Sequence, residues 1–237
     1  MSDPKILVLD IEWAPALAYV WRMYDENISP DQLIDHGGML CVCASWYGSN
    51  EYMFWSKWEH GREGMAKAML ELLSEADAVV HYNGIKYDMP KITGEILLAG
   101  LSPPPKVANI DLLRVVKKFG FNMNRLAYIG PLLGLGAKEK HAGFNLWKDV
   151  MNGCPKAQKK MTRYCIQDVR ITVKLYKKVL PFITDHPALR AGAHNCPNCG
   201  SHKTQKRGPR FTRFFRIQRN QCQSCGSWFE TTRSRIK

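Results

Sequence analysis

The sequence has 237 residues, 45% of them hydrophobic, and a formal net charge of +13. This length suffices for one sizeable domain with a small appendage, and the basic balance favours a polyanionic partner such as nucleic acid. The sequence shows no secretory signal, and no window approaches the roughly 18 to 20 apolar residues of a membrane span. We therefore expect a cytoplasmic protein, neither secreted nor bound to a membrane.

The positive charge is concentrated near the C-terminus. Residues 190–237 contain eleven Lys or Arg residues and one acid, which leaves a net charge of +10, whereas residues 1–189 carry only +3. Two prolines and two histidines interrupt residues 181–195, as is typical of a domain boundary. These features predict a main domain over residues 1–183, a linker over 184–194 and a small basic domain over 195–237.

Apolar runs in the first part of the sequence predict strands. Residues 6–9 form a continuous apolar run followed directly by acids, which is typical of a central strand buried on both faces. Residues 39–46 and 51–55 are further strand-like runs, separated by the turn-like Gly48-Ser49-Asn50. Three strands in succession predict a meander.

Helices and strands then alternate along the rest of the main domain. Helical spacing of apolar residues, short apolar runs and proline breaks predict, in chain order, a helix at 62–76, a strand at 78–80, a helix at 91–99, a strand at 107–110, helices within 112–133 and a long helix at 156–179. A meander followed by alternating elements predicts an α/β domain with a mixed sheet flanked by helices.

Four acids are candidates for a metal site. Asp10 and Glu12 leave one face of a strand because they are two residues apart. Asp88 follows the fourth strand, and Asp168 shares one face of the long helix with Tyr164, four residues earlier. Each acid has an ordinary alternative, such as a solvated strand end, a helix cap or a surface position. Together they predict two Mg²⁺ or Mn²⁺ ions, the hard cations that cleave phosphodiesters.

Three segments carry a resemblance to a known family. Asp10-Ile11-Glu12, Tyr82-Asn83 with Tyr87-Asp88, and Tyr164 to Asp168 occur in this order. They resemble the three exonuclease motifs of the DEDD superfamily, most closely those of the proofreading domains of family B DNA polymerases, over residues 5–180. The third segment, with Tyr164 four residues before Asp168, resembles the motif of the tyrosine subclass. The resemblance implies a ribonuclease H-like fold and 3′-5′ exonuclease activity.

The resemblance also implies individual roles. Asp10 would bridge two metal ions, Glu12 and Asp168 would complete the tighter site, Asp88 would hold the second ion through water, and Tyr164 would orient the attacking water. Asn83 matches the asparagine of the second motif, so the resemblance implies that its side chain helps to seat the substrate strand. For Asp111, which also follows a strand, we expect a structural or capping role instead.

Four of the eight cysteines form two close pairs. Cys196 and Cys199, then 22 residues, then Cys222 and Cys225 have the spacing of two zinc knuckles, so we expect one structural Zn²⁺ in a small zinc-ribbon β domain. Four thiolate ligands leave no open position on the zinc ion for catalysis. A segment this small needs a bound metal to stabilise its fold. His194 and His202 are less favoured substitutes, and the other four cysteines are expected to be buried thiols.

Basic and aromatic residues alternate between the two knuckles. Phe211, Phe214 and Phe215 lie among the predicted substrate-binding residues Arg210, Arg213, Arg216 and Arg219. Arginines that neutralise phosphates beside aromatics that stack on bases are typical of single-strand binding surfaces. In the alternative, the phenylalanines form a small core and the arginines only solvate a hairpin.

The favoured function is therefore a 3′-5′ DNA exonuclease whose basic zinc ribbon grips single-stranded or branched substrate. Two enzymatic alternatives are a structure-specific endonuclease for flaps, forks and junctions, and an exoribonuclease. A non-enzymatic alternative is a nucleic-acid-binding module with a decayed nuclease site. A small domain of this kind is similar to phage replication and recombination proteins, which implies partners of that class and a bacterial or phage-infected host cytoplasm.

Overall fold

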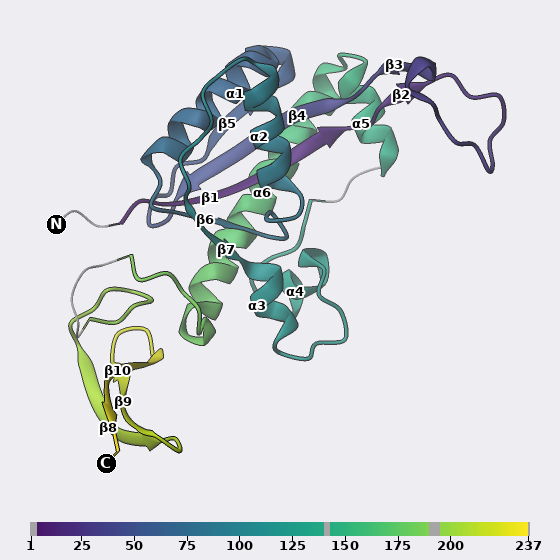
Figure 1. Cartoon of the computed structure of the whole chain (residues 1–237). Helices are drawn as coiled ribbons and strands as arrows, with labels where there is room; N and C mark the ends of the chain where they lie inside the picture. Colours follow the sequence, from purple (N-terminus) through teal and green to yellow (C-terminus); the bar gives the residue numbers. More distant parts are fainter. Residues whose placement is uncertain (1–3, 140–142, 190–194, 237) are drawn as a thin grey trace.

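A computed structural model describes residues 4–139, 143–189 and 195–236. A five-stranded mixed sheet forms its centre (Figure 1), in the order β5-β4-β1-β6-β7. The strands are β1 (Ile6–Ala14), β4 (Gly38–Trp46), β5 (Met53–Ser56), β6 (Ala78–His81) and β7 (Ala108–Asp111). β1, β4 and β5 form the expected antiparallel meander, and β6 and β7 extend the sheet in parallel. The predicted α/β fold with a mixed sheet is confirmed.

Helices cover both faces of this sheet. On one face lie α1 (Lys57–Glu75) and α2 (Asp88–Leu98). On the other lie α3 (Leu112–Lys117), α4 (Leu126–Leu132), α5 (Phe144–Met151) and α6 (Pro155–Val179), which runs across β1 and β4. Each face has its own hydrophobic core. β1 is apolar throughout its first half because it is buried on both sides.

Alternation along β1 decides which way its acids face. Leu7 and Leu9 pack in the core beneath α1 and α2, whereas Ile6 and Val8 pack in the core beneath α6. Because successive side chains of a strand point to opposite faces, Asp10 and Glu12 lie on the α6 side. β1 pairs with β6 only as far as Val8, so both acids lie just beyond the parallel pairing.

α6 is the long helix that the sequence predicts. It begins with Pro155 at a first-turn position, where the missing N–H costs nothing, and continues for 25 residues. Its buried stripe includes Tyr164, Cys165 and Asp168 as well as aliphatic residues. The helix therefore carries polar groups into the interface with β1.

The helical stretch expected within residues 112–133 is interrupted. α3 ends at Lys117, Gly120 has a positive φ of 68°, and α4 begins only at Leu126. α5 was not predicted from the sequence at all. None of the helices in the described ranges is long and apolar enough to cross a membrane.

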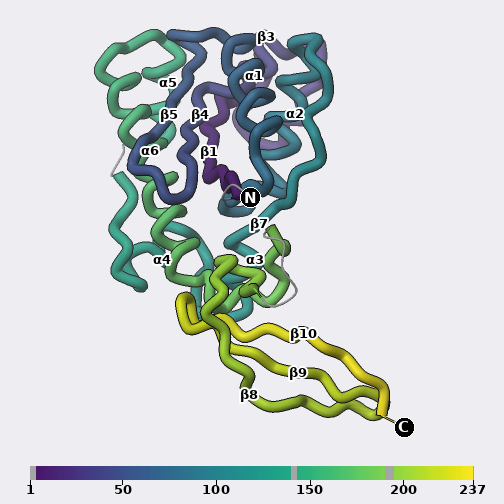
Figure 2. The backbone as a smooth tube through the Cα atoms, turned by 90° about the vertical axis from the view of Figure 1, so that its left-hand side faces the viewer, coloured from purple at the N-terminus to yellow at the C-terminus, as the bar shows by residue number. Residues whose placement is uncertain are grey.

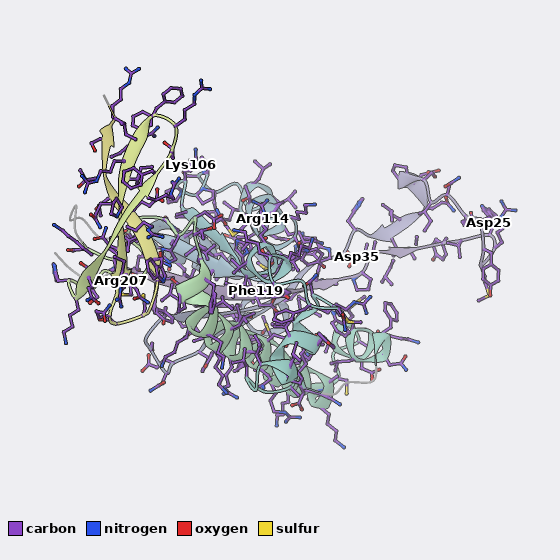
Figure 3. The ribbon with its side chains drawn as sticks, turned by 90° about the horizontal axis from the view of Figure 1, so that it is seen from below. Asp25, Asp35, Lys106, Arg114, Phe119 and Arg207 are labelled. Carbon is purple, nitrogen blue, oxygen red and sulfur yellow. The ribbon has the colours of Figure 1, made fainter. Side chains whose placement is uncertain are left out.

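An arm that the sequence analysis did not predict lies between β1 and β4. It contains β2 (Leu17–Ala18), a short 3-10 helix (Pro30–Gln32) and β3 (Leu33–Asp35). Figure 3 shows the arm, with Asp25, at the opposite end of the molecule from Arg207 of the ribbon. Its exposed large side chains are Leu17, Tyr19, Val20, Trp21, Met23, Tyr24, Ile28 and Ile34.

The C-terminal residues form a separate three-stranded antiparallel sheet (Figure 2). β9 (Phe215–Cys222) lies between β8 (Thr204–Phe211) and β10 (Trp228–Arg235). This ribbon contacts the main domain through its first cysteine knuckle. The buried Asn198 side-chain amide donates to the backbone oxygens of Leu180 and Ile183, at 2.7 and 2.9 Å, just after α6. The domain boundaries at residues 183 and 195 stay predictions.

We expect Asn198→Ala to destabilise this contact. The substitution removes the donor of the Ile183 carbonyl oxygen and leaves the Leu180 oxygen with only the Ile183 backbone N–H, which costs about 1 to 3 kcal/mol in free energy of unfolding. Urea denaturation measures the loss. Asn220→Ala is the matched control, because Asn220 is equally buried but bonds within the ribbon, to Thr231.

In limited proteolysis, Asn198→Ala should release the ribbon from the main domain sooner than Asn220→Ala does. Equal release by the two variants would contradict a docking role.

Candidate functional site

Three of the predicted acids meet between β1 and α6. Asp10, Glu12 and Asp168 each offer a carboxylate oxygen, and these oxygens all lie within 4.8 Å of one another. Asp168 is almost fully buried, while the two strand acids are half-buried. On the opposing strand β4, Asp10 and Glu12 pair with Cys43 and Cys41. Three oxygen ligands in this arrangement suit a hard divalent cation.

Asp88 lies beside this group but outside it. It occupies the first turn of α2, and its carboxylate accepts a hydrogen bond from the backbone N–H of Ile11 at 3.2 Å. That contact fixes Asp88 against the strand segment between Asp10 and Glu12. The N-cap of α2 is Tyr87, so Asp88 is not the capping residue that the alternative interpretation requires.

Burial and mutual repulsion make this acid group costly when it is charged. Burial, and then the charges of Asp88, Asp168 and Glu12, raise the pKa of Asp10 well above its usual range. Burial, followed by the charge of Asp168, raises the pKa of Glu12 to about 8. Burial also raises the pKa of Asp88 to about 6. Carboxylates that repel one another in this way favour binding of a cation.

Sequence reasoning missed one residue of the site, Lys138. Its Nζ donates to Asp168 Oδ2 at 2.5 Å and to the Tyr164 hydroxyl at 3.3 Å. Burial lowers the pKa of Lys138, but the nearby charge of Asp168 outweighs this and leaves that pKa raised. The ammonium group therefore supplies one fixed positive charge beside the acids. Lys138 lies in the loop after α4, where no periodicity marks it.

Tyr164 lies one helical turn before Asp168, as predicted. Its ring packs edge-on against Trp147 of α5, with ring centroids 5.9 Å apart. Burial and the charge of Asp168 raise the pKa of Tyr164, so its hydroxyl keeps its proton. The α5 helix that the sequence did not predict thus helps to orient a predicted residue.

Asn83 shapes the turn between β6 and α2. It has a positive φ of 71°, and its backbone N–H donates to Asp111 Oδ1 at 2.9 Å. The same oxygen accepts from Leu113 N at 3.0 Å and caps α3, so the structural role expected for Asp111 is confirmed. The next residue, Gly84, has no room for a Cβ, which would lie 2.3 Å from the His81 ring. This turn fixes where α2 begins and hence where Asp88 lies.

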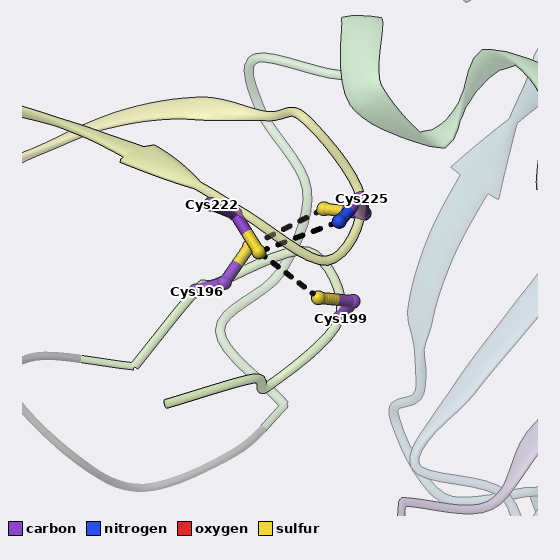
Figure 4. Close-up of side chains that lie close together, drawn as sticks. All are labelled: Cys196, Cys199, Cys222 and Cys225. Atoms are coloured by element: carbon purple, nitrogen blue, oxygen red, sulfur yellow. Dashed lines mark hydrogen bonds between the residues drawn. The ribbon is translucent and has the colours of Figure 1, made fainter. Parts of the chain in front are cut away.

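The four paired cysteines also meet, as Figure 4 shows. One sulfur atom from each lies within 4.8 Å of the others, with Cys196 to Cys225 and Cys199 to Cys222 both at 3.6 Å. Burial raises the pKa of the Cys222 thiol, but backbone N–H donors from Cys225 and Ser224 outweigh it and lower this pKa to about 7. A low thiol pKa favours the thiolate that zinc requires.

The donor set of this cluster is compatible with a zinc ribbon. Four sulfur ligands in two knuckles match a closed tetrahedral zinc site. Gly200 and Gly226, which follow the pairs, have positive φ values of 70° and 84°, as tight knuckle turns require. Among the described residues the group contains cysteines alone, without His202, and His194 lies outside the described residues.

The predicted substrate-binding arginines lie in different environments. Arg210 is paired with Glu230 through two hydrogen bonds, of 2.8 and 3.1 Å. Arg213 lies in the turn between β8 and β9, over the ring of Phe214. Arg216 and Arg219 are three residues apart on β9 and therefore face opposite sides of the ribbon. The structure does not gather these four side chains into one cluster.

The comparisons identify the family. The RNase_H superfamily profile matches residues 34–180. The chain belongs to the ribonuclease H superfamily. No curated protein matches the sequence.

Two solved structures are similar to this superfamily member, and the first of them shares its fold. The family B DNA polymerase of the hyperthermophilic archaeon Pyrobaculum calidifontis is similar over 76% of this chain, with 19% identity and a TM-score of 0.58. RNase D of Trypanosoma brucei is similar over 73% of this chain, with 17% identity and a TM-score of 0.46. The chain spans 25% of the polymerase and 56% of the RNase D. The superfamily assignment, with the acidic group, supports metal-dependent nuclease activity in general.

The raised carboxyl pKa values predict how pH affects stability. Because the folded protein holds these protons more tightly than the unfolded chain, the contribution of Glu12 and Asp88 is complete below about pH 4. It is lost as the pH rises through about 6 for Asp88 and about 8 for Glu12. Without added Mg²⁺ the free energy of unfolding should therefore fall between pH 5 and pH 8, and Mg²⁺ should reduce that fall.

Urea denaturation at several pH values, with and without Mg²⁺, measures this effect. Glu12→Gln should flatten the upper part of the profile, whereas Glu71→Gln, on the exposed side of α1, should leave the profile unchanged. A fall that persists in Glu12→Gln would count against the assignment of that pKa.

We also expect the four thiols to hold one zinc ion. Cys222→Ser removes one ligand, so native mass spectrometry should find no zinc and the ribbon should unfold at lower temperature. Cys154→Ser, at the N-cap of α6 and outside the cluster, is the control and should keep the metal. Zinc retained at full occupancy in Cys222→Ser would show that the cluster is not its site.

Proposed function

We propose that the protein is a two-metal-ion 3′-5′ exonuclease that acts on DNA. The observation that carries the proposal is the meeting of Asp10, Glu12 and Asp168 within 4.8 Å, with Asp88 fixed beside them. Acids without histidine or cysteine among them favour Mg²⁺ or Mn²⁺. The order and spacing of the motifs, and Tyr164 within the third, support the exonuclease class and its 3′-5′ direction.

In this mechanism the acids hold the metal. Asp10, Glu12 and Asp168 would bind one ion, and Asp10 with Asp88 would hold the second. The ions, when bound, activate water and stabilise the leaving oxygen of the phosphodiester. Tyr164, with its hydroxyl protonated, donates a hydrogen bond that orients the attacking water. Asn83 holds the substrate strand at the turn before Asp88.

Lys138 gains a role in the same scheme. Its ammonium contacts both Asp168 and Tyr164, so it fixes the two side chains relative to each other. A positive charge at this point also favours the approach of a phosphate to a site that is otherwise acidic. Lys138 is thus a positioning residue beside the metal ligands.

The charge of the ribbon supports a nucleic acid as substrate. Residues 190–237 carry most of the net charge, and β8, β9 and β10 among them form a sheet that projects from the main domain (Figure 2). Such a basic appendage binds nucleic acid through its phosphates and holds it near the site where it is cut. Single-stranded or branched DNA is the proposed substrate, and replication or recombination proteins are the proposed partners.

A nuclease assay tests this proposal. We expect 5′-labelled single-stranded DNA in Mg²⁺ or Mn²⁺ to give a ladder of single-nucleotide steps from the 3′ end. Asp10→Asn and Asp168→Asn should each lower the rate about a thousandfold or more, because metal stabilisation worth several kcal/mol is lost. Glu71→Gln, an exposed acid on α1, is the matched control with unchanged rate.

The same assay separates the alternatives. A single internal cut in flap, fork or junction substrates would replace the exonuclease by a structure-specific endonuclease. Faster degradation of RNA than of DNA would make the enzyme an exoribonuclease. Activity that survives both Asp10→Asn and Asp168→Asn would overturn the assignment of the site.

A further inference from the structure

The strand register divides the ribbon into two chemically different faces. Residues directly opposite each other in an antiparallel sheet lie on the same face. Arg210 and Arg233 both pair with the buried Ile217 at the centre of β9, Glu230 pairs with Arg219, and Arg235 pairs with Phe215. We call this side the arginine face. Its charged members are Arg207, Arg210, Arg219, Glu230, Arg233 and Arg235.

Side-chain contacts agree with this division. Arg233 stacks over the ring of Phe215 at 3.6 Å, and Arg219 lies 5.9 Å from the ring centroid of Trp228. Arg207 Nε donates to Gln221. Gln221 is two residues after Arg219 on β9 and therefore lies on the same face. The guanidinium groups of Arg219 and Arg233 therefore lie over aromatic rings of the same face. These groups remain at the exposed surface of the sheet.

The opposite side has a different composition, and we call it the amide face. It carries two cations, Lys206 and Arg216, around a shallow groove of about 280 Å³. The Gln218 amide donates to the backbone oxygen of Arg219, and the Asn220 amide donates to Thr231. These donors are used to hold the ribbon together. The amide face thus has half the net charge of the arginine face, which has five arginines against one acid.

We propose that the arginine face, rather than the whole ribbon, binds the phosphate backbone of single-stranded nucleic acid, and that Trp228 stacks on one of its bases. This inference rests on the proposed nuclease function and names the surface that holds its substrate. Five guanidinium groups on one small sheet repel one another, and a chain of phosphates relieves that repulsion. Trp228 is 53% exposed at the edge of the face, where a base can stack on it.

The charge of the arm shows that exposed aromatic residues alone do not make such a surface. Residues 15–37 expose several aromatic rings but contain four acids and one arginine. A phosphate chain would be repelled there. The arginine face combines exposed aromatic surface with a larger excess of positive charge than the amide face has.

Two double variants test the face directly. Arg219→Gln with Arg233→Gln removes two charges from the arginine face, and Lys206→Gln with Arg216→Gln removes two from the amide face. Fluorescence anisotropy with a labelled single-stranded DNA, without added divalent ion, gives Kd at several salt concentrations. The first pair should raise Kd about tenfold or more and reduce the salt slope by about 1.4. The second pair should raise Kd less than about threefold.

Single aromatic variants test the stacking contact. Trp228→Ala should weaken binding by between about fivefold and a hundredfold, as loss of one stacked base does. Phe211→Ala is the matched control, because Phe211 is similarly exposed but pairs with Arg216 on the amide face. Native mass spectrometry for zinc and circular dichroism establish that each variant keeps its fold.

Each outcome decides the inference. Equal weakening by the two double variants, or no weakening by the first, overturns the assignment of the arginine face. Binding of poly-glutamate with unchanged affinity for DNA in the first variant would make the face a site for an acidic protein instead. Face-selective binding without any cleavage in Mg²⁺ or Mn²⁺ would leave this inference standing and remove the proposed nuclease function.

Discussion

The repulsion among three carboxylates, one buried and two half-buried, is the constraint on which the proposed site depends. Asp10, Glu12 and Asp168 bring their oxygens within 4.8 Å of one another between a central strand and a long helix. Unpaired charges in such a place are unfavourable, and the raised pKa values of Asp10 and Glu12 express that cost. Lys138 offsets part of it with one ammonium group. Divalent cations would offset the rest. The arrangement of the carboxylates in the fold therefore favours binding of metal ions.

The architecture keeps these acids close without letting them collapse into the core. On β1 they follow Val8, where β6 stops pairing, so the strand beyond this point is flanked by β4 alone. Asp88 reaches the same strand from α2 by bonding to Ile11 N, and the Asp111 carboxylate anchors the turn that leads to it. Asp88 and Asp111 thus connect neighbouring elements by accepting hydrogen bonds from their backbone N–H groups. The position of the site is a consequence of sheet topology.

Periodicity explains which parts of the molecule were predictable. Local spacing places Asp10 and Glu12 on one face of a strand. It likewise places Tyr164 and Asp168 on one face of a helix. The fold then brings these two faces together. Lys138 lies in a loop, where spacing carries no information about tertiary contacts. The arm over residues 15–37 exposes its apolar side chains, so its composition gave no pattern of a buried face. In the ribbon, bulges after Lys206 and Glu230 shift the register, so the face of each arginine followed only from strand pairing.

One helix connects the acidic site to the cysteine cluster. Tyr164 and Asp168 lie in the middle of α6, and Tyr176 near its end packs against Tyr47 beside the first knuckle. Asn198 of that knuckle then binds the carbonyl oxygens that follow the helix. Because one continuous helix reaches both places, Asp168 and the first cysteine knuckle are positioned by the same element. The ribbon therefore starts from a defined point relative to Asp168, as the proposed role of guiding a strand toward the acids requires.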